Sequence, residues 1–242
     1  MSDETREKRE IVQSEAQDLT AKFISSLVGL GPAYELITKL IVPLHEKKKR
    51  EFINDLAIRL KRLEEQGMVD FEKLALNEEF NTIITKAILL AQQNHQEEKL
   101  KALRAITINS ALNVNKPSEM FDWAMHFLHI LDRISPMHIL LLKTFRNPYS
   151  AVEEKRVDLS EKGLYRNDEI FFRLYPELKD RSALISQCWN ELVSYGFIID
   201  EHFGLGTGKS HTMHTDEKIL SKSTDFGNKF LEMIEYSEQE GQ

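Results

Sequence analysis

The sequence predicts a mainly α-helical protein in two parts, a helical bundle over residues 1–135 and a C-terminal domain over residues 136–242. Apolar residues recur at three- and four-residue steps through most of the first part, which is the spacing of one helix face. This pattern restarts at Ser135-Pro136, because proline suits the first turn of a new helix. Near the end, the stretch Phe197–Phe203, a glycine-rich turn and the segment His211–His214 predict a small two-stranded hairpin.

The N-terminal segment does not have the pattern of an export signal or a membrane span. Residues 1–10 carry many charges of both signs, lack an apolar signal core and are predicted to be disordered. The most apolar segment, Phe23–Leu44, is interrupted by Gly29, Gly31 and Pro32. A membrane-spanning helix needs about 20 nearly uninterrupted apolar residues. We therefore expect two short buried helices hinged at Gly31-Pro32, with membrane insertion as the alternative.

Around six helices with short connectors are expected in the N-terminal part, which makes a bundle. Gly67 is expected to end the first strongly periodic helix, and Ser118 to begin the last one. The apolar faces that predict these helices are Phe52, Ile53, Leu56, Leu60 and Leu63; Phe71, Leu74 and Leu76; Phe80, Ile83, Ile84, Ala87, Ile88 and Ala91; Leu100, Leu103, Ile106 and Ala111; and Met120, Trp123, Phe127, Ile130, Leu131 and Ile134.

The C-terminal part is predicted to contain four helices. Asn147-Pro148 ends the first of them, and a polar connection over residues 150–166 follows. The third helix is expected to turn Leu184, Ile185, Cys188 and Leu192 inward and to stop at Gly196, while Thr224 or Asp225 begins the fourth. The expected helices span Pro136 to Phe145, Glu169 to Leu174, Arg181 to Tyr195, and a last segment bearing Phe226, Phe230, Leu231 and Ile234.

The order of three helices followed by a two-stranded hairpin, with a further helix behind it, resembles a winged-helix domain. The resemblance covers residues 136–242, and its most suggestive phrase is WNELVSYGFIID, in which a helix ends at glycine and leads directly into a strand. Winged helices bind DNA, RNA or other proteins, so the resemblance implies a fold and leaves the ligand open.

Composition favours a soluble cytoplasmic protein. The chain has 242 residues, 41% of them hydrophobic, and a net charge of -7, so it can bury a core and has no overall attraction for nucleic acid or anionic lipid. Its single cysteine, Cys188, excludes an internal disulfide and fits a reducing compartment.

Two motifs suggest ligands but fail when their spacing is checked. GLGTGKSHT, from Gly204 to Thr212, ends like a phosphate-binding P-loop, but Phe203 stands where the first glycine is needed. His126 with His129, and His211 with His214, lack the further ligands that zinc requires. No cofactor and no metal are therefore predicted.

One helix carries a polar stripe, which we interpret as a solvated or interface face. It is formed by Asp122, His126, His129 and Arg133.

No signature of an activated serine, a cysteine–histidine pair or paired carboxylates is present, and Cys188 is expected to be a small core residue. Because these signatures are missing from the sequence, an enzyme is the less favoured class. The basic run Lys47–Arg50 could contact phosphates, but acidic residues follow it on the same helix, which favours a solvated helix end.

The presumed recognition helix is expected to expose polar but uncharged residues. Residues 136–242 contain 13 lysines and arginines against 18 acidic residues, a net charge of -5, whereas a DNA reader usually has a basic footprint. The candidate contacts with a partner or with nucleic acid are Lys179, Arg181, Ser186, Gln187, Asn190, Lys209 and His211.

Three functions remain open. The leading hypothesis is a non-enzymatic interaction or regulatory protein that binds a protein partner, for example as a subunit of a larger assembly. The second is a DNA-binding regulator, and the third is a membrane-active helical effector that uses residues 23–50. A large exposed apolar patch would favour a protein partner, and a basic recognition face would favour DNA.

Overall fold

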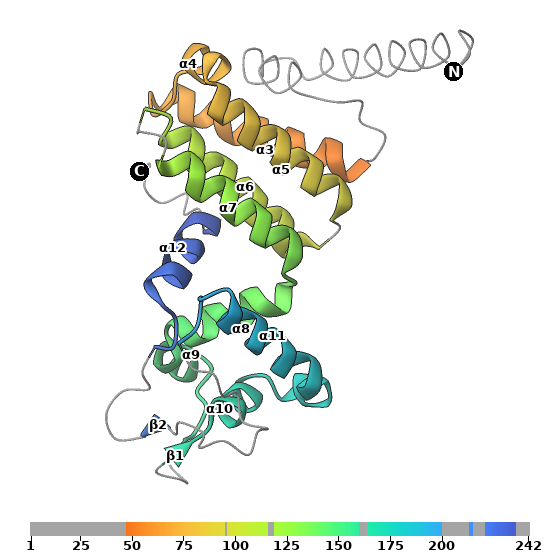
Figure 1. Cartoon of the computed structure of the whole chain (residues 1–242), viewed down its shortest axis with the longest axis vertical. Coiled ribbons are helices and arrows are strands. Elements are labelled where there is room, and N and C mark those ends of the chain that lie inside the picture. Colours follow the sequence, from red (N-terminus) through yellow and green to blue (C-terminus); the bar gives the residue numbers. More distant parts are fainter. Residues whose placement is uncertain are drawn as a thin grey trace, which may run out of the picture. The chain divides into compact units, whose positions relative to one another are not determined.

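The computed structural model describes residues 47–94, 96–115, 119–159, 164–199, 213–214 and 221–235. Within these ranges the chain forms ten α-helices, one 3-10 helix and one pair of two-residue strands (Figure 1). The prediction of a mainly α-helical protein is confirmed. The chain divides into two compact units: residues 1–133 together with 233–242 form unit 1, and residues 134–232 form unit 2.

Unit 1 contains a helical bundle, as predicted. Helix α5 packs against α3, α4, α6 and α7, and α6 also contacts α3 and α7. Figure 1 shows α3, α5, α6 and α7 lying side by side. The described helices of this bundle are α3 (Lys47–Glu65), α4 (Phe71–Leu76), α5 (Glu78–Gln93), α6 (Glu97–Leu112) and α7 (Glu119–Arg133).

Helix α6 is buried on most of its sides. Ten of its sixteen residues are buried, and they include Thr107, Ser110 and several alanines. A helix that is apolar nearly all round belongs inside a bundle. The buried hydroxyls of Thr107 and Ser110 are satisfied within the helix, because each donates to the carbonyl oxygen four residues earlier.

The predicted apolar faces of unit 1 are mostly buried. Phe127, Leu131 and Leu56 are fully buried, whereas Met120 and Trp123 are only half-buried. Leu76 is 84% exposed, so the end of α4 contributes nothing to the core. Ser118, the predicted start of the last bundle helix, lies outside the described residues.

Gly67 ends α3 as predicted. Its φ of +71° is in the left-handed region that favours glycine, and the amide of Met68 donates to the carbonyl of Leu63 at 2.8 Å. This pair of features is a Schellman cap, which the sequence signals locally.

The lysine Lys99 is buried and joins two helix ends. Its Nζ donates to the backbone carbonyl of Asp132 in the last turn of α7 at 3.1 Å. Burial lowers the pKa of Lys99, and the nearby charge of Asp132 partly opposes this shift. A cation at this position also interacts favourably with the negative end of the α7 dipole.

Unit 2 contains the elements that the winged-helix resemblance concerns. Helices α8 and α11 pack against each other, and η1 contacts α10 and α11. The elements are α8 (Pro136–Arg146), α9 (Pro148–Glu154), β1 (Leu164–Tyr165), α10 (Asn167–Leu174), η1 (Pro176–Arg181), α11 (Ser182–Ser194), β2 (Met213–His214) and α12 (Asp225–Ile234), whose last two residues belong to unit 1.

Aromatic rings fill the core of unit 2. The ring of Phe145 in α8 packs edge-on against Trp189 of α11, with 4.8 Å between the ring centroids. The ring of Phe171 in α10 stacks on Phe145, with 6.4 Å between centroids. Phe197 stacks on Phe230 of α12 at 4.7 Å. All five rings are essentially inaccessible to solvent, so they tie α8, α10, α11 and α12 together.

The connection over residues 150–166 differs from the prediction. It contains most of α9 and the strand β1. The sequence of this connection has no apolar periodicity that would predict these elements. They contribute only a few side chains to a small cluster around Tyr165, Ile170 and Leu174. Val152 and Val157 pack against this cluster.

The predicted hairpin also differs from the described strand pairs. Strand β2 pairs antiparallel with β1, with Leu164 opposite His214, and Ile198 forms a single bridge to Ser223. Residues 200–212, which would contain most of the hairpin, lie outside the described residues.

Gly196 turns the chain from α11 into the core. Its φ is +74°, and the amide of Phe197 donates to the carbonyl of Leu192 at 2.9 Å. This Schellman cap directs Phe197 inward immediately after the helix ends. Thr224 begins α12 as one of the two predicted caps, since its Oγ1 accepts from the amide of Gly227 at 2.9 Å.

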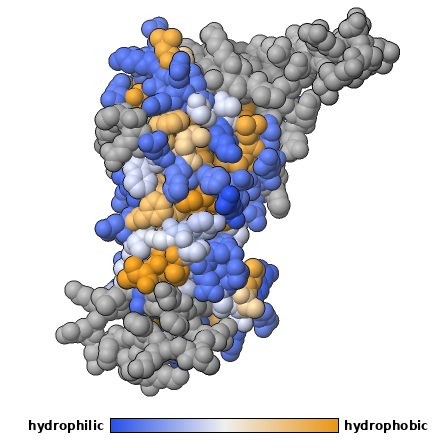
Figure 2. All heavy atoms as spheres, in the orientation of Figure 1, coloured by the Kyte–Doolittle hydropathy of each residue, from blue (hydrophilic) through white to orange (hydrophobic). Residues whose placement is uncertain are grey.

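Hydrophobic side chains also reach the surface. On the face drawn in Figure 2, orange residues interrupt the blue surface of the described part. In the part of the chain that the structure describes, the exposed large hydrophobic residues are Met68, Leu76, Leu89, Tyr149, Leu184 and Ile199.

Candidate functional site

The strongest candidate surface is the exposed side of α11. We define the α11 face by residues that follow one another along this helix: Leu184, Gln187, Asn190, Glu191 and Ser194. Glu191 is half-buried, and the other four are exposed. The face is therefore polar and largely uncharged, with one leucine at its start.

Ile185, Cys188 and Leu192 of α11 are buried as predicted, and Leu184 is the exception. We expected it to point inward, but it is 55% exposed. The buried residues of α11 are Ile185, Cys188, Trp189 and Leu192, which recur at helical spacing. Trp189 is the larger side chain and fills the core, which leaves Leu184 at the surface.

The predicted contact residues separate into three groups. Gln187 and Asn190 are exposed on the α11 face, and Lys179 and Arg181 are exposed at the end of η1. Ser186 is half-buried with a buried Oγ, so the expectation that it is exposed was wrong. Lys209 and His211 lie outside the described residues.

A hydrogen-bonded network connects the α11 face to α8. Nε2 of His138, a buried residue of α8, lies 2.8 Å from Oε2 of Glu191. The other carboxylate oxygen of Glu191 accepts from the side-chain amide of Gln187 at 2.8 Å. At the far side of the imidazole, the backbone N–H of Ser135 donates to Nδ1 at 3.0 Å. The network therefore connects the start of α8 to the middle of α11.

These contacts assign the tautomer of His138. Nδ1 accepts a hydrogen bond from the Ser135 backbone, so in the neutral ring the hydrogen is on Nε2 and is donated to Glu191. The pKa of Glu191 is lowered, first by the hydrogen bond from Gln187 and then by that from His138. Glu191 is therefore a carboxylate at neutral pH.

Ser135, His138 and Glu191 contain the residue types of a hydrolytic triad, but they act differently. The Ser135 hydroxyl lies 2.9 Å from Nδ1 of His138. A general base needs a free lone pair to take the serine proton, and the Ser135 backbone N–H already occupies the lone pair of Nδ1. His138 is the third residue of α8, so its side chain serves as half of a capping box.

This network was not predicted from the sequence. Ser135 and His138 have the spacing of a capping box, which is a local signal, although histidine replaces the usual Glu or Gln. Glu191 lies 53 residues from His138, so only the packing of α11 on α8 brings the two together.

Cys188 is buried, as predicted, at 2% exposure. Burial raises the pKa of its thiol, and a hydrogen bond with Ser135 opposes the shift only in part. We expect slow labelling of the folded protein by a thiol reagent and fast labelling after unfolding, because the thiolate is the reactive form. The rates can be compared by mass spectrometry with and without denaturant. Rapid labelling of the folded chain would contradict the packing of α11.

The polar stripe on α7 is exposed throughout. Asp122, His126, His129 and Arg133 are all exposed, so their predicted position opposite the core is confirmed. Within the described ranges, no group of three or more metal-binding side chains is present. His126 contacts the ring of Phe127, with 6.2 Å between centroids.

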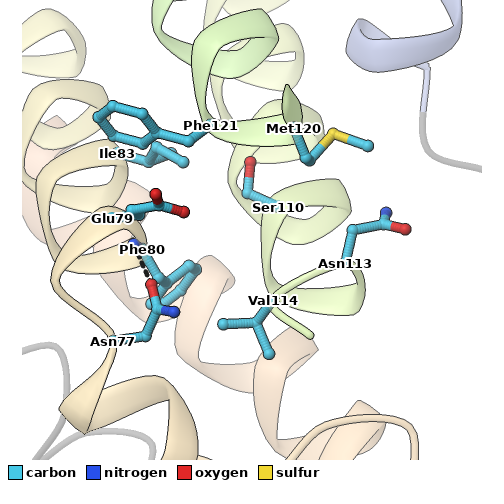
Figure 3. A pocket seen from close by; sticks show the side chains of 9 residues that line it. All are labelled: Asn77, Glu79, Phe80, Ile83, Ser110, Asn113, Val114, Met120 and Phe121. Atoms are coloured by element: carbon cyan, nitrogen blue, oxygen red, sulfur yellow. Dashed lines mark hydrogen bonds between the residues drawn. The ribbon is translucent and has the colours of Figure 1, made fainter. Parts of the chain in front are cut away.

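A shallow pocket lies in unit 1 where three helix ends meet. Figure 3 shows Glu79 and Phe80, from the start of α5, facing the end of α6 and the turn after it. Its cavity volume is about 20 Å³, far below the usual range of small-molecule sites, which is roughly 300–1,000 Å³. Glu79 is its one ionisable residue. The lining residues are Asn77, Glu79, Phe80, Ile83, Ser110, Asn113, Val114, Met120 and Phe121.

Other predicted features lie mostly outside the described residues. These include residues 1–10, the apolar segment Phe23–Leu44 and the loop Gly204–Thr212. The basic run Lys47–Arg50 opens α3, and Arg50 is exposed. Among the helices that the structure describes, none combines the length and apolar character needed to cross a membrane.

Comparison of the chain with family models, with curated proteins and with solved structures found no match.

Proposed function

We propose that this chain is a non-enzymatic interaction protein that docks a protein partner through the α11 face of a winged-helix-like unit. The order of α8, α10 and α11 followed by β2 supports this interpretation of residues 136–242. The antiparallel pairing of β1 with β2 supports a small sheet in the same unit. The winged-helix assignment is part of the proposal.

The observation that carries the proposal is the exposure of Leu184. At 55% exposure it leads a helix face whose other exposed residues are uncharged. The centres of protein–protein interfaces are depleted of charged side chains, and this face combines an apolar side chain with uncharged polar ones. The two flanking cations, Lys179 and Arg181, are accompanied by Glu177 and Asp180, so the helix start has no net positive charge.

Photo-crosslinking in the native cell tests the proposal. A photoreactive amino acid replacing Leu184 is expected to give a protein adduct that is absent when it replaces Glu154, an exposed residue of α9. The adduct protein, once purified, should bind the wild-type chain and lose about tenfold or more in affinity for Leu184→Asp. Leu76→Asp is the matched control, because Leu76 is an exposed leucine in unit 1. Adducts with nucleic acid alone would overturn the proposal.

We also expect binding to duplex DNA to be weak and nonspecific. Three basic residues, Lys179, Arg181 and Lys209, are expected from the sequence on a DNA-facing side, so the log-log salt dependence should be no steeper than about -3. Replacing all three by alanine should abolish the remaining binding without changing the circular dichroism spectrum. Selection from random duplexes gives the contrary result if it yields one motif bound at about nanomolar affinity, as specific readers do. The protein would then be a DNA-binding regulator.

A further inference from the structure

The α11 face presents the carboxylate of Glu191, which His138 and Gln187 orient, as a hydrogen-bond acceptor. Glu191 is held as a carboxylate by His138 and Gln187, and each of its oxygens accepts one of these hydrogen bonds at 2.8 Å. An ionised carboxylate has about four acceptor positions, so further donors can still bind. The side chain of Glu191 is 38% exposed, which makes it accessible to a partner.

Gln187 is oriented by the same contact. One of its amide hydrogens is donated to Glu191, because an ionised carboxylate can only accept. Its carbonyl oxygen therefore points away from Glu191 and remains an acceptor for a partner.

Leu184 and Glu191 lie on the same side of α11. Seven residues separate them, which is almost two helical turns, or about 10 Å along the axis. Among the described residues, no lysine or arginine forms an ion pair with Glu191, and its contact with His138 is a hydrogen bond of 2.8 Å. The face thus combines an apolar side chain with a carboxylate that still lacks a strong cation.

We propose that the occupant of the α11 face is a basic segment of a protein, with a lysine or arginine on Glu191 and an apolar side chain on Leu184. This inference rests on the proposed function, since it assumes that α11 is the docking helix. Charge complementarity selects the partner: an acidic segment would be repelled by Glu191, and a phosphate backbone would be repelled in the same way. The guanidinium of arginine suits the site best, because it can donate two parallel hydrogen bonds to a carboxylate.

Selection of a displayed random-peptide library against the full chain tests the inference. We expect enriched peptides that carry an arginine or lysine and an apolar residue at positions about 10 Å apart in the bound form. Their affinity should fall about tenfold in Glu191→Gln and in Leu184→Ala. Glu154→Gln, which removes an exposed carboxylate from α9, is the matched control and should bind like the wild type. Affinity should also fall as salt is raised.

A second variant keeps the inference testable if Glu191→Gln does not fold. Asn190→Lys adds a positive charge to the same face at an exposed position and leaves the His138 contact intact. It should weaken the selected basic peptides to a similar degree. Circular dichroism of each variant shows whether the fold is kept.

The outcomes separate the inference from the proposed function. Peptides that need Leu184 but are indifferent to both Glu191→Gln and Asn190→Lys would overturn the basic occupant and leave protein docking at α11 in place. Enrichment of acidic peptides, or no enrichment at all, would also overturn it, while crosslinking at position 184 would still decide the function. An enriched DNA motif bound through α11 would overturn both.

Discussion

Replacing Leu56 or Phe127 by alanine is expected to lower the free energy of unfolding of the bundle by about 2–5 kcal/mol each. Both side chains are 0% exposed, Leu56 on α3 and Phe127 on α7. Truncation removes the transfer free energy of the buried atoms and leaves a cavity in a close-packed core. Denaturant unfolding followed by circular dichroism measures the change.

The control for this prediction is Leu76→Ala. Leu76 belongs to the same unit but is 84% exposed, so its truncation should change stability by no more than about 0.5 kcal/mol. If Leu56→Ala and Phe127→Ala each cost less than about 1 kcal/mol, the range of ordinary surface substitutions, the core assigned to the bundle is wrong.

Gly227→Ala is expected to destabilise unit 2 by about 1–3 kcal/mol, although alanine favours helices over glycine by about 1 kcal/mol. Gly227 lies in the first turn of α12, where a Cβ would be only 2.4 Å from the carbonyl oxygen of Phe197. That oxygen belongs to backbone and accepts the amide of Thr224 at 3.0 Å, so it cannot move without breaking this contact.

Thermal or chemical unfolding of Gly227→Ala beside Lys229→Ala checks this prediction. Lys229 lies in the same helix and is half-buried. Lysine already has a Cβ, so Lys229→Ala places another alanine in α12 without adding an atom to the backbone contact with Phe197. An increase in the stability of Gly227→Ala would show that α12 lies farther from Phe197 than the structure places it. The expected sign therefore distinguishes tight packing from simple propensity.

Local sequence signals predicted several helix ends correctly. Pro136 begins α8, Gly67 follows α3, and Gly196 follows α11. Thr224 caps α12 through its hydroxyl. Each of these signals depends on a few consecutive residues, because caps satisfy backbone groups that the helix itself leaves without partners.

Predictions failed where a distant segment supplies the stabilisation. Strand β1 has two residues and exists through its pairing with β2, which follows α11 in the sequence. Helix α9 buries only Pro148 fully, so periodicity gave it no apolar face. Contacts between segments far apart in the sequence leave no pattern among neighbouring residues.

The helical class, the bundle, the main caps and the polar stripe on α7 were predictable from local patterns, because periodicity and capping are properties of neighbouring residues. Two features were not predictable in this way: Trp189 and not Leu184 enters the core, and His138 and Gln187 hold Glu191 as a carboxylate on the α11 face. Both outcomes depend on how α11 packs on α8. Helical spacing fixes which residues share a face, but the volume available in the core and the partner across the interface fix which face is buried.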